Sequence, residues 1–143
     1  MRMLHVFLST VVAVGCLASC APKQHSVVAQ SAEKLMVSGQ LTMRERLALS
    51  PTAVAEVALI EAGNPDAPAL GQQRIPFNGK QVPINFNLVV EESRLPPSAN
   101  YILRGAIEDD GGNMRWIVET PVTITPGANQ VDVGTLVVVR EQS

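Results

Sequence analysis

Hydrophobic and polar residues alternate along much of this chain beyond residue 34. The clearest case is residues 82–90 (VPINFNLVV), in which every second residue is apolar, as in a strand with one buried face. Residues 43–49 (MRERLAL) could supply one helical turn, but we expect an extended arm or a continuation of the strand before them. Less regular alternation predicts further strands at residues 35–42, 53–61, 74–77, 101–108, 114–119, 122–125 and 134–140.

Turn-forming residues separate nearly every pair of predicted strands. Gly, Asn and Asp tolerate the positive φ that tight hairpin turns require, and the chain contains ten glycines and ten prolines. We therefore predict an all-β fold over residues 35–143, a single antiparallel β-sandwich of about seven to eight short strands, immunoglobulin-like or transthyretin-like. The predicted turns include residues 63–66, 78–79, 95–97, 109–113 and 126–127.

Two predicted strands are apolar on both faces, within residues 54–60 and residues 136–139. A strand that is covered on one side only normally alternates. Either these strands lie centrally in the fold or loops cover their outer faces. The alternative is an exposed apolar strip on which a segment of a partner docks.

The first residues of the chain have the features of an export signal. Arg2 precedes an apolar run over residues 6–17, too short for a permanent transmembrane helix but suited to a secretory signal. Leu17-Ala18-Ser19-Cys20 then resembles a bacterial lipobox, with Cys20 as the acylated residue. Cys16 is a poorer cleavage site, and a plain secreted protein is the alternative. We predict a signal peptide over residues 1–19 and a lipidated N-terminus with a flexible tether over residues 20–34.

Composition argues against several classes of function. The chain has 11 basic and 13 acidic residues and no basic block, which argues against a nucleic-acid partner. His5 belongs to the predicted signal and His25 to the predicted tether, so the predicted domain lacks the usual general base and metal ligand. With Cys20 lipidated, no disulfide or thiolate site remains. We therefore expect a protein that is not an enzyme and has no cofactor and no metal.

A few residues in the predicted domain invite individual interpretation. Arg44, Glu45 and Arg46 form the densest charge cluster; they are solvated or paired across strands, or they bind a partner. Trp116, the only tryptophan, fills the core or lies on the surface as a partner-binding residue. Residues 109–113 (DDGGN) lack the alternating oxygen ligands of an EF-type calcium loop and predict a hairpin turn.

Several motifs, in this order and spacing, resemble a family of small bacterial lipoproteins. They are residues 37–39 (VSG), 44–53 (RERLALSPTA), 57–61 (VALIE), 81–88 (QVPINFNL) and 101–107 (YILRGAI). The resemblance extends over about residues 36–140, past Trp116 and the Pro126-Gly127 turn. The family is that of the YbaY-type lipoproteins, grouped with the YscW-type lipoprotein chaperones, or pilotins, of type III secretion.

The resemblance implies a lipid-anchored, non-enzymatic β-sandwich. In the pilotin branch, the lipoprotein escorts a secretin subunit to the outer membrane and aids ring assembly. We accordingly expect an outer-membrane lipoprotein, facing the periplasm and held in the membrane by its N-terminal lipid anchor. Its expected partner is a secretin or another outer-membrane assembly protein. The alternative is a structural or polysaccharide-binding lipoprotein of the cell envelope.

Overall fold

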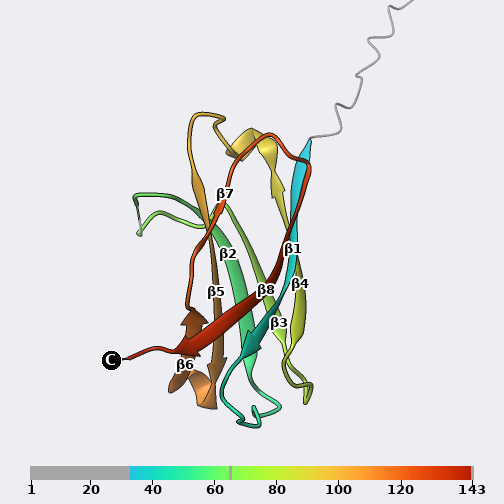
Figure 1. The fold of residues 1–143 in the computed structure, drawn as a ribbon, viewed down its shortest axis with the longest axis vertical. Helices are drawn as coiled ribbons and strands as arrows, with labels where there is room; N and C mark the ends of the chain where they lie inside the picture. The colour runs from blue at the N-terminus through green and yellow to red at the C-terminus, as the bar shows by residue number, and fades with distance from the viewer. Residues whose placement is uncertain (1–32, 65, 143) are drawn as a thin grey trace, which may run out of the picture. The chain divides into compact units, whose positions relative to one another are not determined.

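The computed structural model describes residues 33–64 and 66–142, and these residues form an all-β fold (Figure 1). Short 3₁₀ turns, η1 (Glu92–Arg94) and η2 (Asp110–Gly112), follow β4 and β5. The expected turn at residues 109–113 is therefore confirmed as the connection between β5 and β6. The eight strands are β1 (Lys34–Met43), β2 (Val54–Glu61), β3 (Gly71–Pro76), β4 (Ile84–Glu91), β5 (Tyr101–Asp109), β6 (Met114–Val118), β7 (Val122–Ile124) and β8 (Gln130–Arg140).

The strands form one sheet in the order β3-β2-β5-β6-β8-β1-β4, and β7 pairs with β5 beside this path. The sheet curls so far that its two edge strands, β3 and β4, come close together. No backbone ladder joins these edges in the described residues, but the Asn87 amide donates a hydrogen bond of 2.9 Å to Gln73 Oε1. The result is a nearly closed, barrel-like sheet.

The predicted all-β class and number of strands are confirmed, but the prediction of a wholly antiparallel fold is wrong. β1 and β8 run parallel, with Leu41 opposite Leu136. Between Ser38 and Gln40 the register shifts, so that two residues of β8 oppose Gly39, which is a β-bulge. All strands belong to one hydrogen-bonded sheet, and the immunoglobulin-like or transthyretin-like sandwich is not confirmed.

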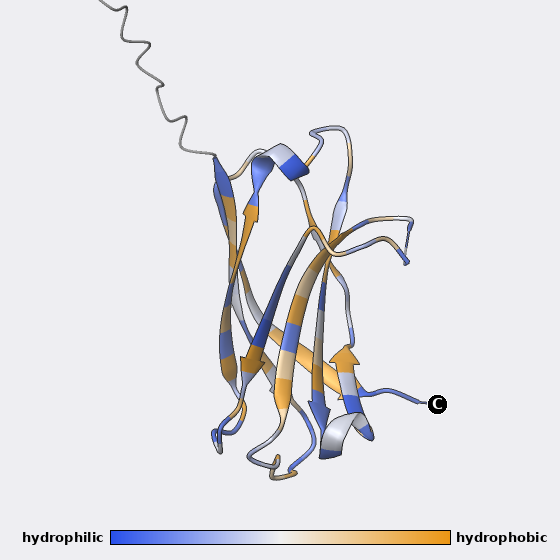
Figure 2. Cartoon of the chain, turned by 180° about the vertical axis from the view of Figure 1, so that it is seen from behind, coloured by the Kyte–Doolittle hydropathy of each residue, from blue (hydrophilic) through white to orange (hydrophobic). Residues whose placement is uncertain are grey.

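The alternating sequence pattern is visible directly in the burial of the strands. In β4 every second residue is buried, from Ile84 to Val90, as predicted. Figure 2 shows the same alternation of apolar and polar residues along the strands. The two largest fully buried side chains are Trp116 and Tyr101, and the rest of the core is mainly aliphatic. Burial of this apolar surface is the main force that holds the fold together.

The segment after β1 is neither helix nor strand, and hydrogen bonds to the Gln81 and Asp109 side chains fix its end. The main chain of Leu49 exchanges two hydrogen bonds with the Gln81 side chain, 2.8 and 3.0 Å long, much as a neighbouring strand would. The carboxylate of Asp109, only 4% exposed, accepts hydrogen bonds from the Ser50 amide (3.0 Å), the Ser50 hydroxyl and the Asp110 amide (2.8 Å). The connection between β1 and β2 is thus tied to the rest of the sheet.

Candidate protein-binding groove

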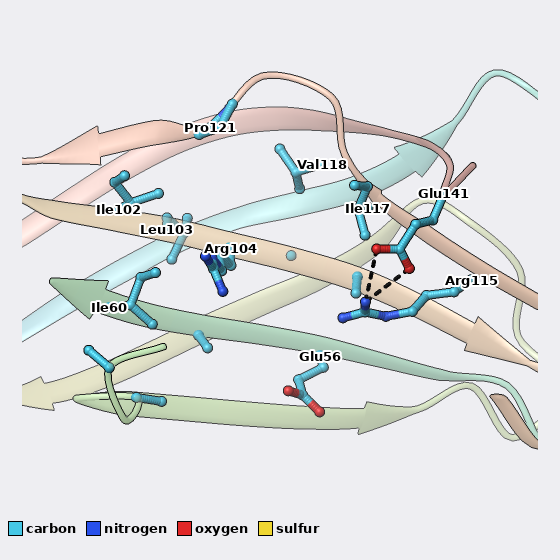
Figure 3. A pocket seen from close by; sticks show the side chains of 15 residues that line it. Glu56, Ile60, Ile102, Leu103, Arg104, Arg115, Ile117, Val118, Pro121 and Glu141 are labelled. Atoms are coloured by element: carbon cyan, nitrogen blue, oxygen red, sulfur yellow. Dashed lines mark hydrogen bonds and ion pairs between the residues drawn. The ribbon is translucent and has the colours of Figure 1, made fainter. Parts of the chain in front are cut away.

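A groove of about 550 Å³ lies on the outer face of β2, β5 and β6 (Figure 3). Its floor is made by outward-facing side chains of these strands, and its sides include the connection after β2 and the segment between β6 and β7. The lining residues are Glu56, Ala58, Ile60, Ala67, Ala69, Ile102, Leu103, Arg104, Gly105, Ala106, Arg115, Ile117, Val118, Pro121 and Glu141.

One half of the groove is apolar because β2 and β5 carry small or aliphatic residues on both faces. Ala55, Val57 and Leu59 of β2 are buried in the core, so Ala58 and Ile60 face outward by strand alternation. Ile60 stands opposite Ile102 of β5, and Ala58 stands opposite Arg104. Figure 3 shows Ile60 and Ile102 beside each other on neighbouring strands, with Arg104 next to them. These apolar residues favour contact with apolar side chains of a partner.

The other half of the groove adjoins a chain of alternating charges. Arg74 Nη1 lies 2.8 Å from Glu56 and its Nη2 lies 3.9 Å from Glu108. Arg115 Nε lies 3.4 Å from Glu108, and its Nη1 lies 3.0 Å from Glu141 near the end of the chain. All five side chains are 30–56% exposed, so each pair contributes only about 0.2–1 kcal/mol to folding. The network therefore holds charged side chains along this half of the groove but adds little to the folding free energy.

Beneath the groove, β5 changes its neighbour along one edge from β6 to β7. The β6 ladder ends with Ala106 opposite Ile117, and the β7 ladder begins with Leu103 opposite Val122. Between these two ladders the chain leaves β5, and Gly105 lies beside the gap. The groove is accordingly lined by Leu103, Gly105 and Val118 together with Pro121.

Arg44 and Arg46, the two arginines singled out in the sequence, do not line this groove. Both are exposed on the segment after β1. Arg44 pairs with Glu119, with 3.0 Å between Nη2 and Oε2, and its side chain is 70% exposed. Leu47, beside them, is one of three large apolar residues that are exposed in the described part of the chain. Pairing of Arg44 therefore agrees with one of the two interpretations offered above, and a partner role for either arginine stays a prediction.

Trp116 lies in the core and not on the surface. Its side chain is 0% exposed, and the Arg140 guanidinium carbon lies 5.8 Å from the centre of its ring. The indole Nε1 is buried and has no hydrogen-bond partner among the described residues. Direct contact between Trp116 and a partner is thus prevented in this conformation, because the ring has no accessible surface.

Tyr101, at the start of β5, is also buried, but its hydroxyl has a hydrogen-bond partner. The hydroxyl donates a hydrogen bond of 2.8 Å to the carbonyl of Pro96. Burial, together with the nearby negative charge of Glu61, raises the pKa of Tyr101 above its usual value. The side chain therefore stays neutral and serves to hold the loop before β5.

The predicted signal and anchor residues, Leu17, Ala18, Ser19 and Cys20, lie outside the described residues, as does most of the predicted tether. β1 begins at Lys34, one residue before the predicted domain boundary. Within residues 33–64 and 66–142, no helix is both long and apolar enough to span a membrane. The same residues contain no cluster of three or more His, Cys, Asp or Glu side chains suited to a metal ion.

Of the residues that line the groove, the sequence pattern indicated only those of β2. The apolar outer face of residues 54–60 was noted, and Ala58 and Ile60 are part of the lining. The residues from β5 and β6 gave no separate signal, because an outward Ile102 or Ile117 looks like ordinary strand alternation. Only the strand order brings them beside β2.

Comparison with known proteins gives a family-level match. A sequence model of the type III secretion system lipoprotein chaperone family (YscW) matches residues 32–134. The uncharacterized lipoprotein YbaY of Escherichia coli (strain K12) is 32% identical over 159 aligned positions, which cover 99% of this chain and 82% of YbaY.

A solved structure is similar as well. It is that of an alternative pilotin from the type II secretion system of Vibrio cholerae, with 32% sequence identity and a TM-score of 0.62. The match covers 74% of this chain and 97% of the pilotin chain. The similarity thus includes nearly the whole of that pilotin and about three quarters of this chain.

Proposed function

The chain belongs to the family of type III secretion system lipoprotein chaperones (YscW), and we propose that it acts as a pilotin-like lipoprotein chaperone that binds an outer-membrane assembly protein. The partner that we propose is a secretin subunit. The observation that carries this proposal is the match to the type II secretion pilotin, at 32% identity over 97% of that chain. In this role the protein binds and delivers its partner and does not catalyse a reaction.

The groove on β2, β5 and β6 is the proposed binding site. A chaperone of this kind needs a surface that takes up apolar side chains of its partner and releases them again. The groove supplies apolar contacts through Ala58, Ile60 and Ile102, and it is bordered by charges that are paired with one another. Its volume of about 550 Å³ is in the range of sites that hold a few side chains and is too small for a folded domain.

The proposed anchor is a lipid on Cys20, followed by the tether that ends where β1 begins. A flexible tether of about 14 residues spans about 20 Å on average by random-coil scaling. In the proposed arrangement the domain works on the periplasmic side of the outer membrane, within reach of a secretin that inserts there.

Site-specific photocrosslinking in cells tests the proposed groove. A photoreactive residue placed at Ala58, half-buried in the groove, should crosslink to the secretin of the same organism. The matched control is the same photoreactive residue at Ser98, which is exposed in the loop before β5 and outside the groove lining. Equal secretin crosslinking at both positions would argue against the groove as the binding site.

Loss of the protein tests the function itself. A strain that lacks it should show fewer heat-resistant secretin multimers in its outer-membrane fraction, and the wild-type protein should restore them. Normal amounts of multimers in the deletion strain, with the secretin at wild-type levels, would overturn the pilotin proposal.

A further inference from the structure

We propose that Asn78 is a site of spontaneous covalent modification, at which the asparagine is converted to aspartate and isoaspartate through a succinimide. The site lies outside the groove, in the turn that joins β3 to β4 at one end of the sheet (Figure 1). An asparagine that precedes a glycine is the most reactive kind in this chemistry, and Asn78-Gly79 is the one such pair in the chain. The proposal does not depend on which partner the protein binds.

The turn exposes the reacting groups to water. The Lys80 amide donates a hydrogen bond of 2.9 Å to the Phe77 carbonyl and so closes the turn. Between them, Asn78 and Gly79 have φ values of 50° and 83°, in the left-handed region that asparagine and glycine tolerate best. Both residues are exposed. The Asn78 side-chain amide is therefore open to water, which the last step of the reaction consumes.

Gly79 supplies a suitable nucleophile, its backbone nitrogen. The Gly79 N–H donates no hydrogen bond to another described residue, so no bond has to break before this nitrogen attacks. A Cβ atom built on Gly79 would have nothing within 4 Å, so the surroundings of the nitrogen are open. Glycine also brings no side chain of its own to the attacking nitrogen. The turn therefore leaves the nucleophile accessible as well as the side chain that it attacks.

The reaction requires only water. The Gly79 nitrogen loses its proton and bonds to Asn78 Cγ, while the bond from Cγ to the side-chain nitrogen breaks and ammonia leaves. The product is a five-membered succinimide ring. Water then opens the ring at one of its two carbonyl carbons. Opening at Cγ gives aspartate, and opening at the main-chain carbonyl carbon gives isoaspartate, whose backbone runs through Cβ. The net change is gain of water and loss of ammonia, which adds one negative charge and involves no oxidant or reductant.

The other asparagines are less suited to this reaction, because each precedes a residue other than glycine. Asn85 and Asn87 lie within β4, whose backbone is held in the ladder with β1. Asn113 is exposed, as Asn78 is, but it precedes Met114, whose side chain crowds the attacking nitrogen. Asn113 is therefore a matched comparison, since it differs from Asn78 chiefly in the residue that follows.

Formation of isoaspartate should loosen this end of the sheet. It adds one atom to the backbone inside a turn that the bond from Lys80 to Phe77 closes. Phe77 is fully buried and its amide is bonded to the Ala53 carbonyl, so the change should not spread into β3. On the other side, Gln81 Oε1 accepts the Leu49 amide at 2.8 Å. We therefore expect faster hydrogen exchange at the Leu49 amide in the modified protein.

Mass spectrometry of the aged full-length protein tests the proposal. During long incubation in mildly alkaline buffer, the peptide that contains Asn78 should gain one mass unit. In water enriched in heavy oxygen it should gain three, because one oxygen atom comes from the solvent. The peptide that contains Asn113 should keep its mass. Asn78→Gln should suppress the gain, since glutamine would have to close a six-membered ring, whereas Asn113→Gln should leave the gain at Asn78 unchanged.

A synthetic peptide of residues 75–81 provides the reference for the same sequence without the fold. If this peptide reacts while Asn78 in the intact protein keeps its mass, the fold protects the site and the proposal is overturned. Equal gains at Asn78 and Asn113 would also overturn it. A gain at Asn78 with unchanged exchange at Leu49 supports the site but overturns the loosening. Thermal unfolding shows whether Asn78→Gln folds; if it does not, Asn113 and the peptide decide.

Discussion

At the scale of single residues, Asp109 shows how a buried charge can determine local structure. Burial by itself would raise the pKa of this carboxyl, but hydrogen bonds from the Ser50 side chain, the Ser50 amide and the Asp110 amide outweigh it, and the pKa is lowered below the usual 3.8. Hydrogen bonds donated to a carboxylate favour its charged form over its neutral form. Asp109 thereby fixes both the turn after β5 and the end of the segment after β1.

Replacement of Asp109 by alanine should destabilise the protein. Loss of the carboxylate leaves buried donors of Ser50 and Asp110 without a partner, which costs about 2–3 kcal/mol in the free energy of unfolding. Urea denaturation of Asp109→Ala against the wild type measures this cost. Asp66→Ala, which removes an exposed carboxylate in another loop, is the control and should change the stability much less.

The stabilising effect of Asp109 should also depend on pH. Since its pKa is lower in the folded than in the unfolded state, its contribution is fully present well above the unfolded-state pKa and is lost as the pH falls through the folded-state pKa. The difference in stability between the wild type and Asp109→Asn should therefore shrink as the pH is lowered below about 5. A difference that stays constant over this range would show that the charge of Asp109 does not stabilise the fold.

Trp116 provides a spectroscopic test of the core. Because the ring is fully buried and its Nε1 lacks a hydrogen-bond partner among the described residues, we expect blue-shifted native fluorescence that moves to the red in urea. The chain has a single tryptophan, so the signal needs no deconvolution. Native emission already at the wavelength of a solvated indole would contradict the buried position.

At the scale of strands, the sequence predicted where the strands lie but not how they pair. Alternation located all eight strands to within a few residues, because a one-sided core imposes a period of two on each strand separately. The start of β8 was missed because Gln130 is exposed and polar and Asp132 is exposed as well. The parallel β1–β8 pairing was also missed, since periodicity within a strand contains no information on the direction of its neighbour.

The bulge in β8 explains why β1 has a glycine at position 39. The alternation of apolar and polar residues in β1 does not explain it. A Cβ atom on Gly39 would lie 2.8 Å from the Gly134 carbonyl oxygen, from Phe86 Cζ and from Val133 Cγ2. Because the backbone oxygen cannot move without distorting the bulge, Gly39→Ala should cost about 1–3 kcal/mol. Thermal or urea unfolding checks this, with Ser38→Ala in the same strand as the control. Equal stability of Gly39→Ala and the wild type would mean that the backbone of the bulge can shift to make room for the added methyl group at little cost.

At the scale of the whole molecule, the proposed anchor and the groove belong to different parts of the chain, and only the anchor was proposed from the sequence. A signal of the lipobox type is a contiguous string, whereas the groove joins residues from β2, β5 and β6 that are far apart in the sequence. Ile60, Ile102 and Ile117 line one groove only because β5 pairs with β2 on one edge and with β6 on the other. Their common role therefore depends on strand order, which the period-two pattern does not encode.

This separation predicts that binding and delivery can be lost independently. Cys20→Ser removes the proposed lipid site but leaves the groove unchanged, so the variant should still crosslink to the secretin while both are lost from the outer-membrane fraction. Ala58→Lys places a charge in the apolar half of the groove and should abolish the crosslink from a photoreactive residue at Ala69, another lining residue, while the lipoprotein stays in that fraction. Ser98→Lys should behave as the wild type. Fractionation of cells that express each variant measures both properties. If Cys20→Ser delivers the secretin as well as the wild type does, the anchor is not needed for delivery, and the groove alone accounts for the function.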